Sequence, residues 1–205
     1  MLNFKRPEMG QPAGTPRPDV AMAPLTQLSM RDASVAIGPI LPDDTAAIFL
    51  WLNDVESIAL DFAYRPVDWM SYNNWLEGLS KNPSQVMFAI RHVHQSRIMG
   101  YVGLTKLDAV HRSGEIGIRI GSEADRGKGY GKGAVRLVMN YAWNHLNLNR
   151  AYLSVFASNR RALNAYKTAG FQEEGRQRQA AFINGSWMDV VLMAALRPWK
   201  GASDE

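Results

Sequence analysis

The stretch RGKGYGKG, residues 126–133, places four glycines at every second position, with an arginine in front and two lysines between them. Glycine loses more conformational entropy on folding than any other residue, so this run needs a compensating role. The preceding GEIGIRI, residues 114–120, alternates as a strand does, and residues 134–148 repeat apolar side chains at helical spacing. The stretch therefore predicts a strand-to-helix loop, which is either a plain turn or a ligand-binding segment.

Positive charge is concentrated around this loop. The chain has 23 lysines and arginines and 19 acidic residues, and none of the acidic residues lies between positions 126 and 172. The same segment holds eight of the basic residues. Such segregation favours a polyanionic ligand, and both nucleic acid and phosphorylated cofactors meet that requirement.

Dinucleotide binding is the first alternative for the loop, because Gly129, Gly131 and Ala134 satisfy the spacing G-x-G-x-x-A between a strand and a helix. That motif also requires an acidic residue about twenty positions further on, which bonds the ribose. The next acidic residue after the loop is Glu173. The sequence therefore lacks the partner on which the dinucleotide interpretation depends.

A nucleoside triphosphate loop is the second alternative, and it fails for lack of a hydroxyl group. Its motif ends in a lysine followed by Ser or Thr, which binds the magnesium ion, whereas Lys132 is followed by Gly133. What remains is a loop whose backbone N–H groups, with the positive end of the next helix dipole, bind a pyrophosphate. Arg126, Lys128 and Lys132 would add positive charge to that site.

The rest of the chain predicts one α/β domain with a mixed sheet. Half of the ten prolines lie in residues 1–30, which we interpret as a flexible tail; residues 31–199 form the domain and 200–205 a short C-terminal tail. Asn184-Gly185 indicates a hairpin turn. The expected elements are strand 34–40, helices 42–55 and 69–79, strands 86–91, 97–107 and 114–120, helix 134–148, strand 151–156, helix 158–170 and hairpin strands 176–183 and 187–193.

The loop resembles a known family motif. The spacing Arg126-x-x-Gly129-x-Gly131 is similar to the [RQ]-x-x-G-x-[GA] loop of the GNAT superfamily of N-acetyltransferases. The resemblance covers residues 34–199. On this basis residues 126–132 would hold a pyrophosphate through backbone amides, and the alternative is a plain turn.

Segments downstream of the loop extend the resemblance. The family shows an asparagine, a tyrosine seven residues later and then Gly-Phe, and Asn159, Tyr166 and Gly170-Phe171 stand at these places. FINGSWMDVVLM, residues 182–193, is similar to the branch that includes the spermidine and the ribosomal-protein alanine acetyltransferases. By this resemblance Asn159 would bond the pantetheine arm of the cofactor, and it could also cap a helix.

The resemblance implies a fold and a cofactor. The fold is a mixed, mostly antiparallel sheet of about seven strands flanked by about four helices. Its central strands, here 114–120 and 151–156, splay apart, and acetyl-CoA lies in the gap as co-substrate, with no metal. The residues implied in cofactor binding are Ile118, Arg119, Ile120, Arg126, Gly127, Lys128, Gly129, Tyr130, Gly131, Lys132 and Asn159.

The resemblance also implies residues for the chemistry. Tyr166 would protonate the leaving CoA thiolate as a general acid; otherwise it is a core tyrosine. Glu115 would accept the proton of the amine, directly or through water; otherwise it is a solvent-facing carboxylate, and His111 is another candidate base. A backbone N–H of residues 118–120 would meet the oxyanion. The chain has no cysteine, so direct transfer is expected rather than an acyl-enzyme on a thiol.

The acceptor site is expected between the first two helices and the last hairpin. Its candidate residues are the aromatic side chains Phe62, Tyr64 and Trp69, with Tyr72 and Trp75 nearby, unless these aromatics belong to the core. The acidic residues that would attract a cationic amine are Asp54, Glu56 and Asp61. Because these acids are scattered among aromatics, the acceptor stays open between a polyamine, an amino sugar and a protein N-terminus.

Other classes of function have less support in the sequence. The four histidines lack metal-ligand spacing, so no metal is expected. No run of eighteen apolar residues and no signal peptide is present, so we expect a cytoplasmic protein without a membrane partner. A nucleic-acid-binding module is an alternative, although basic residues are not interleaved with aromatic ones, and a CoA-binding sensor without catalysis is another. The family resemblance also allows a homodimer.

Overall fold

The computed structural model describes residues 30–59, 63–94 and 97–198. Within these residues one sheet of eight strands has the order β1-β2-β3-β4-β5-β6-β8-β7. All neighbouring strands are antiparallel except β5 and β6, which are parallel. The strands are β1 (Met30–Arg31), β2 (Val35–Gly38), β3 (Val86–His92), β4 (Ile98–Asp108), β5 (Ser113–Ile120), β6 (Arg150–Phe156), β7 (Gln172–Ile183) and β8 (Ser186–Leu196).

The sheet confirms the mixed, mostly antiparallel architecture, with one strand more than expected. The additional strand is β1, in which Met30 pairs with Ile37 of β2. Apart from Met30, the predicted tails at residues 1–30 and 200–205 lie outside the described residues. The remaining strands agree with the predicted segments to within a few residues at their ends.

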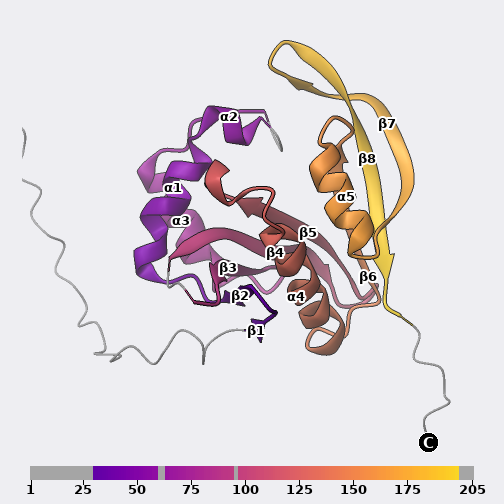
Figure 1. Cartoon of the computed structure of the whole chain (residues 1–205), viewed down its shortest axis with the longest axis horizontal. Helices are drawn as coiled ribbons and strands as arrows, with labels where there is room; N and C mark the ends of the chain where they lie inside the picture. The colour runs from indigo at the N-terminus through magenta and orange to yellow at the C-terminus, as the bar shows by residue number, and fades with distance from the viewer. Residues whose placement is uncertain (1–29, 60–62, 95–96, 199–205) are drawn as a thin grey trace, which may run out of the picture.

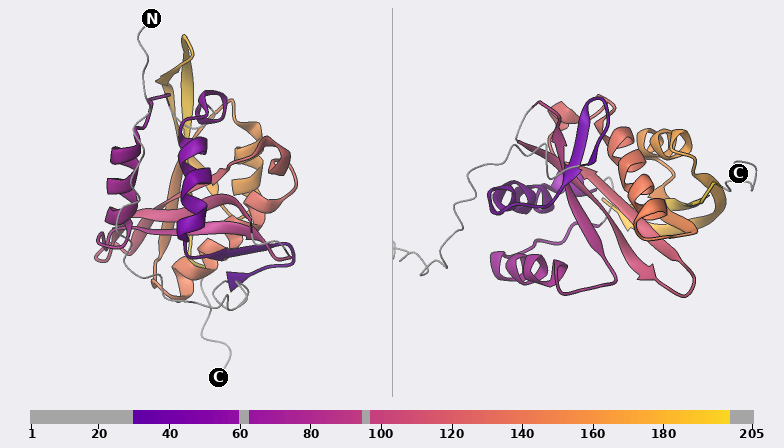
Figure 2. Two further views of the ribbon diagram at one scale, coloured as in Figure 1. Left: turned by 90° about the vertical axis from the view of Figure 1, so that its left-hand side faces the viewer. Right: turned by 90° about the horizontal axis from the view of Figure 1, so that it is seen from below.

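Helices cover both faces of the sheet (Figures 1 and 2). Three helices lie on one face, and α4 and α5 lie on the other, where α4 packs on β2, β4 and β5 and contributes Val135 and Val138 to the core. The α-helices in the described segments are α1 (Thr45–Leu52), α2 (Val55–Ile58), α3 (Trp69–Leu79), α4 (Tyr130–Asn144) and α5 (Arg160–Thr168).

The prediction of one continuous helix over residues 42–55 is wrong. It consists of a 3-10 turn at Pro42–Asp44, followed by α1 and then the separate α2. The chain breaks at Asn53 because this side chain bonds a distant segment: its Oδ1 accepts from the Val67 amide at 2.9 Å, and its Nδ2 donates to the Val67 carbonyl at 3.0 Å. As a result Val55 starts the new helix and is half exposed, rather than completing the apolar face of α1.

The splay between the central strands is confirmed. β5 and β6 pair only through residues 113–115 and 150–152. Beyond that point β5 continues to pair with β4 as far as Ile120, and β6 continues to pair with β8 as far as Phe156. Here β5 pairs only with β4 and β6 pairs only with β8, so a gap opens between the facing edges of β5 and β6.

The predicted hairpin is also confirmed. Asn184 and Gly185 at its turn have positive φ angles of 49° and 78°, as a two-residue turn of the I′ type requires. The last residue of β6, Phe156, pairs with Val190 of β8. The end of the hairpin therefore continues past β6 and extends beyond α5 (Figure 1).

Candidate active site

The glycine-rich loop joins β5 to α4 through a 3-10 turn at Glu123–Asp125. Gly127 and Gly129 have φ angles of 77° and 85°, a region that side chains rarely allow. Gly129 is the N-cap of α4, and its carbonyl accepts a bond of 3.1 Å from the amide of Gly133. The N–H groups that precede Gly133 in the first turn have no acceptor within the helix. They are therefore available to an anion.

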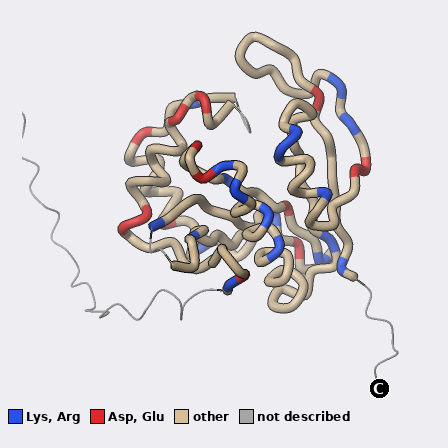
Figure 3. The backbone as a smooth tube through the Cα atoms, in the orientation of Figure 1, with Lys and Arg blue, Asp and Glu red and all other residues tan. Residues whose placement is uncertain are grey.

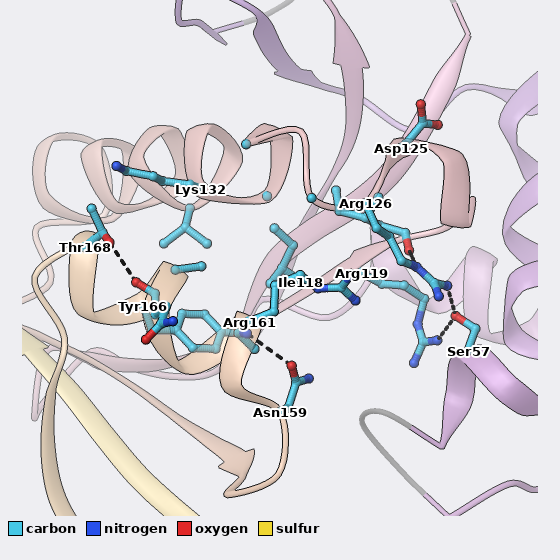
Figure 4. A pocket seen from close by; sticks show the side chains of 18 residues that line it. Ser57, Ile118, Arg119, Asp125, Arg126, Lys132, Asn159, Arg161, Tyr166 and Thr168 are labelled. Carbon is cyan, nitrogen blue, oxygen red and sulfur yellow. Dashed lines mark hydrogen bonds between the residues drawn. The ribbon is translucent and has the colours of Figure 1, made fainter.

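A pocket of about 330 Å³ lies next to this loop and is bounded by β5, α4 and α5 (Figure 4). Tyr166, the predicted acid, is among the residues that line it, and so are nine of the eleven predicted cofactor residues. Those nine are Ile118, Arg119, Ile120, Arg126, Gly127, Gly129, Gly131, Lys132 and Asn159. Lys128 and Tyr130 are not among the lining residues; the Tyr130 ring instead meets His92 edge-on at 5.8 Å.

Positive charge gathers around the pocket, because basic residues follow the loop and the neighbouring helix α5 (Figure 3). The basic residues that line the pocket are Arg119, Arg126, Lys132 and Arg161. One acidic residue, Asp125, also lines it, and Arg97 neutralises that carboxylate. The hydrogen bonds from Arg97 lower the pKa of Asp125, although burial opposes the shift. The pocket therefore presents net positive charge to a ligand.

The side chain of Arg126 bonds the protein itself. Its guanidinium donates to the carbonyls of Ile120 at 3.3 Å and Gly121 at 2.8 Å and to the hydroxyl of Ser57. Arg119, which is buried on β5, donates to the same hydroxyl, with 3.3 Å between Nη1 and Oγ. Figure 4 shows both guanidinium groups directed at Ser57. Helix α2 is thus linked to the start of the loop.

Helix α5 carries the two downstream residues of the predicted site. Asn159 caps this helix, since its Oδ1 accepts from the Ala162 amide at 3.1 Å, and it also lines the pocket. Tyr166 lies seven residues further on, about two helical turns, and so on the same side of α5. Its ring is 5.7 Å from that of Phe171, and only 8% of the residue is exposed. Tyr166 is therefore both a core residue and a pocket residue.

The predicted base, Glu115, lies outside the pocket lining. It is on β5 where this strand still pairs with β6, and its carboxylate is 2.7 Å from Nζ of Lys106. Side chains alternate along a strand, so Glu115 and the exposed Gly117 face away from the core side on which Ile118 packs. His111 lies in the exposed turn between β4 and β5, at the opposite end of β5 from the loop.

Only some of the predicted acceptor residues belong to the described part of the chain. Phe62 and Asp61 lie outside the described residues. Tyr64 and Trp69 are 39% and 52% exposed beside the start of α3, and neither is among the residues that line the pocket. Tyr72 is fully buried, which agrees with the alternative that part of this aromatic set belongs to the core.

Sequence reasoning missed several lining residues. Arg161, Asn164 and Thr168 line the pocket from α5. They are spaced by three and four residues and so share one face of α5, but this face is not the one that carries Asn159 and Tyr166, and the motif residues do not indicate it. Ser57 has no comparable local pattern, because its partner Arg126 is 69 residues away.

The described residues have neither a metal-binding cluster nor a membrane-spanning helix. They contain no group of three or more His, Asp or Glu side chains that could hold a metal ion. No helix in these segments combines the length and the hydrophobicity of a membrane span. The longest helix in them, α4, has 15 residues.

Comparisons with known proteins agree with this geometry. A family model described as an acetyltransferase (GNAT) domain matches residues 35–172. The spermidine N(1)-acetyltransferase of Vibrio cholerae is 36% identical over 103 residues, which are 50% of this chain and 59% of that protein. The putative ribosomal N-acetyltransferase YdaF of Bacillus subtilis is 34% identical over 110 residues, 53% of this chain and 60% of that protein. The match thus spans about three fifths of the length of these relatives.

Solved structures share the fold over most of the chain. The crystal structure of spermidine N-acetyltransferase from Vibrio cholerae, in complex with CoA and spermine, has a TM-score of 0.72 and 26% identity, covering 80% of this chain and 96% of that one. A crystal structure of a probable acetyltransferase has a TM-score of 0.71 at 22% identity, covering 84% and 99%. The second likeness concerns the fold alone.

Proposed function

Because the chain belongs to the GNAT family of acetyltransferases, we propose that it transfers an acetyl group directly from acetyl-CoA to a primary amine. The position of the pocket carries this proposal. The pocket is lined by the glycine loop and by Ile118 and Ile120, the part of β5 that has separated from β6. The backbone N–H and C=O groups at this open strand edge need partners. The part of the pocket beside β5 therefore suits an extended pantetheine arm, and the part beside the loop suits a pyrophosphate.

The loop has the form that a phosphate group requires. A Cβ atom at Gly131 would lie 3.7 Å from Ile120 and 3.8 Å from Ile118, so a side chain there would fill the pocket wall in front of the helix N-terminus. Gly127 and Gly129 permit the backbone angles of the turn. In our proposal the amides of residues 127–132 bind the pyrophosphate, and Asn159 bonds the pantetheine arm.

In the proposed chemistry one side chain accepts a proton and another donates one. Acetyl-CoA supplies the acetyl group as a thioester when bound. Glu115 accepts a proton from the neutral amine, directly or through water, as the nitrogen forms its bond to the acetyl carbon. Tyr166 donates its phenolic proton to the sulfur as the carbon–sulfur bond breaks. A backbone N–H of residues 118–120 stabilises the negative charge that develops on the carbonyl oxygen. The lack of cysteine agrees with direct transfer.

The acceptor, in this proposal, is a primary amine on a small molecule, such as a polyamine or an amino sugar, or on a protein N-terminus. The names of the relatives include both spermidine and ribosomal acetyltransferases. A panel of polyamines, aminoglycosides, nucleotide amino sugars and short peptides, with CoA release as the readout, identifies the class. A homodimer stays a prediction, and light scattering of the purified chain tests it.

Calorimetric titration with acetyl-CoA tests the cofactor half of the proposal. Gly131→Glu places a carboxylate at the pyrophosphate site, and we expect it to weaken binding by at least about tenfold, since one close like charge costs more than 1 kcal/mol. Gly131 suits this test better than Gly129, whose positive φ would strain any side chain. Gly78→Glu, on α3 with open space around it, is the matched control and should bind as the parent protein does.

Two results contradict the proposal in different ways. If the parent protein does not bind acetyl-CoA, or if Gly131→Glu binds it equally well, the proposed cofactor site is wrong. If the parent protein binds acetyl-CoA in the pocket but releases no CoA with any acceptor of the panel, transfer to these classes of amine is wrong, and the result favours a CoA-binding sensor.

A further inference from the structure

Three parts of the molecule meet at one oxygen atom, Oγ of Ser57. Ser57 belongs to the short helix α2, on the face of the sheet opposite α4, and only 3% of it is exposed. Arg126, the first residue of the loop, and Arg119, near the end of β5, both donate to this oxygen. A hydroxyl oxygen has two lone pairs, and here both face guanidinium groups. Hydrogen bonds from charged donors are the stronger kind.

The same contact explains what the Arg126 side chain does. Its guanidinium also donates to the carbonyls of Ile120 and Gly121, which follow each other where β5 ends. Arg126 therefore joins the strand end and α2 while its own backbone begins the loop. A small displacement of the loop backbone must move this guanidinium, or else break its bonds to Ser57.

Helix α2 is well placed to receive such a displacement. It has only four residues, and its N-cap Asp54 accepts from the Ser57 amide at a long 3.4 Å. The described segment that follows, residues 63–68, has no regular secondary structure. The bonds to Ser57 from Arg126 and Arg119 thus link α2 to the loop and to β5, and α2 lies in the layer in which the acceptor site is expected.

We infer that Ser57 is a positioning residue that couples the cofactor loop to helix α2. This inference rests on the proposed function, because it takes CoA as the ligand of the loop. A ligand on the loop amides holds the backbone of Arg126 in place, which keeps its guanidinium on Ser57 and stabilises α2. Coupling between two sites is reciprocal, so an acceptor that contacts α2 must raise the affinity for CoA by the same factor.

Hydrogen exchange with and without saturating CoA tests this coupling. In the parent protein we expect CoA to slow exchange in the peptide that covers residues 55–59 by about fivefold or more, the lower end of typical coupling. Ser57→Ala should bind CoA and lose this effect on α2. Ser71→Ala is the matched control: Ser71 is also the third residue of its helix, follows an aspartate N-cap and bonds it, but it lies on α3 away from the pocket. It should keep the effect.

A second variant protects the test against a folding defect in Ser57→Ala. Arg126→Lys keeps the positive charge but cannot bond Ser57 and two carbonyls with one planar group, and it should also lose the CoA effect on α2. The coupling is overturned if Ser57→Ala and Arg126→Lys retain that effect, or if CoA binds the parent protein without slowing exchange in α2. Failure of the parent protein to bind CoA at all would instead overturn the proposed function.

Discussion

Arg97 holds Asp125 through two parallel hydrogen bonds, with 2.6 Å from Nη1 to Oδ2 and 2.7 Å from Nη2 to Oδ1. Asp125 is the last residue of the turn before the glycine loop, and only 3% of its side chain is exposed, whereas half of the Arg97 side chain is in solvent. A bidentate arginine fixes a carboxylate in orientation as well as in charge. The pair therefore anchors the loop and removes a negative charge from the pocket wall.

Arg97→Met should destabilise the protein in a pH-dependent way. The hydrogen bonds from Arg97 lower the pKa of Asp125 below its ordinary value of 3.8, so the native state holds this proton less tightly than the unfolded state. The resulting stability is present above pH 3.8 and is lost as the pH falls through the lower native pKa. We expect Arg97→Met to cost about 1.5–3 kcal/mol at pH 7 and progressively less in strong acid.

Urea unfolding of the parent and Arg97→Met at several pH values measures this difference. Arg178→Met, at an exposed position on β7, is the control and should change little at any pH. A deficit for Arg97→Met that is the same at pH 7 and in strong acid would show that the ion pair to Asp125 is not its source.

Tyr166→Phe should lower kcat and leave the affinity for acetyl-CoA nearly unchanged. The phenyl ring keeps the contact with Phe171 and the place in the pocket wall, whereas the proton donor is lost. Loss of a general acid typically costs about 10²–10⁴ in rate. Steady-state kinetics and calorimetry separate the two quantities. Tyr141→Phe, on α4 beside Phe88, is the matched control; a kcat of Tyr166→Phe close to that of this control would remove Tyr166 from the acid role.

Glu115→Gln distinguishes the catalytic role of this carboxylate from a structural one. If Glu115 accepts the proton of the amine, Glu115→Gln lowers kcat by about 10²–10⁴, while Lys106→Met, which removes only the partner at 2.7 Å, leaves most of the activity. If the pair is merely a surface ion pair, neither variant changes kcat much and both alter stability by less than about 1 kcal/mol. Initial rates at saturating acetyl-CoA, with Glu173→Gln on β7 as control, decide between these results.

The features that could be predicted from the sequence are those that depend on short local patterns of residues. The loop at 126–133, the alternation in 114–120 and the turn at Asn184-Gly185 each lie within a dozen residues, and each forms the element expected of it. The splay follows from the family resemblance, and the strand pairing confirms it. Local patterns therefore predicted these elements, and the loop they indicate lies beside the pocket.

What could not be predicted depends on contacts between distant segments. Ser57, which lines the pocket, belongs to α2, and the Asn53 side chain between α1 and α2 bonds Val67, 14 residues away. Tyr130 is the first residue of α4, and its ring meets His92 of β3 and does not line the pocket. Helical periodicity alone cannot indicate either outcome.

Asp44→Asn should be among the most destabilising substitutions in the molecule outside the pocket. Asp44 and Arg91 form an ion pair in which each side chain is only 7% exposed. Asp44 Oδ2 also accepts from the Leu41 amide at 2.7 Å, and Arg91 Nη1 donates to the Pro39 carbonyl at 3.2 Å. Removing one partner of a buried pair leaves an uncompensated charge and costs about 3–5 kcal/mol. We therefore expect a clear drop in the midpoint of urea unfolding at pH 7.

The double variant Asp44→Asn/Arg91→Met separates the buried charge from the loss of packing. It removes the cation along with its partner, and replacing a buried pair by neutral groups of similar size is often close to neutral, so most of the lost stability should return. Asp43→Asn, one residue earlier and exposed, is the control and should cost less than about 0.5 kcal/mol. If the double variant is as unstable as Asp44→Asn, the cost comes from the altered turn at Leu41 and not from an unpaired Arg91.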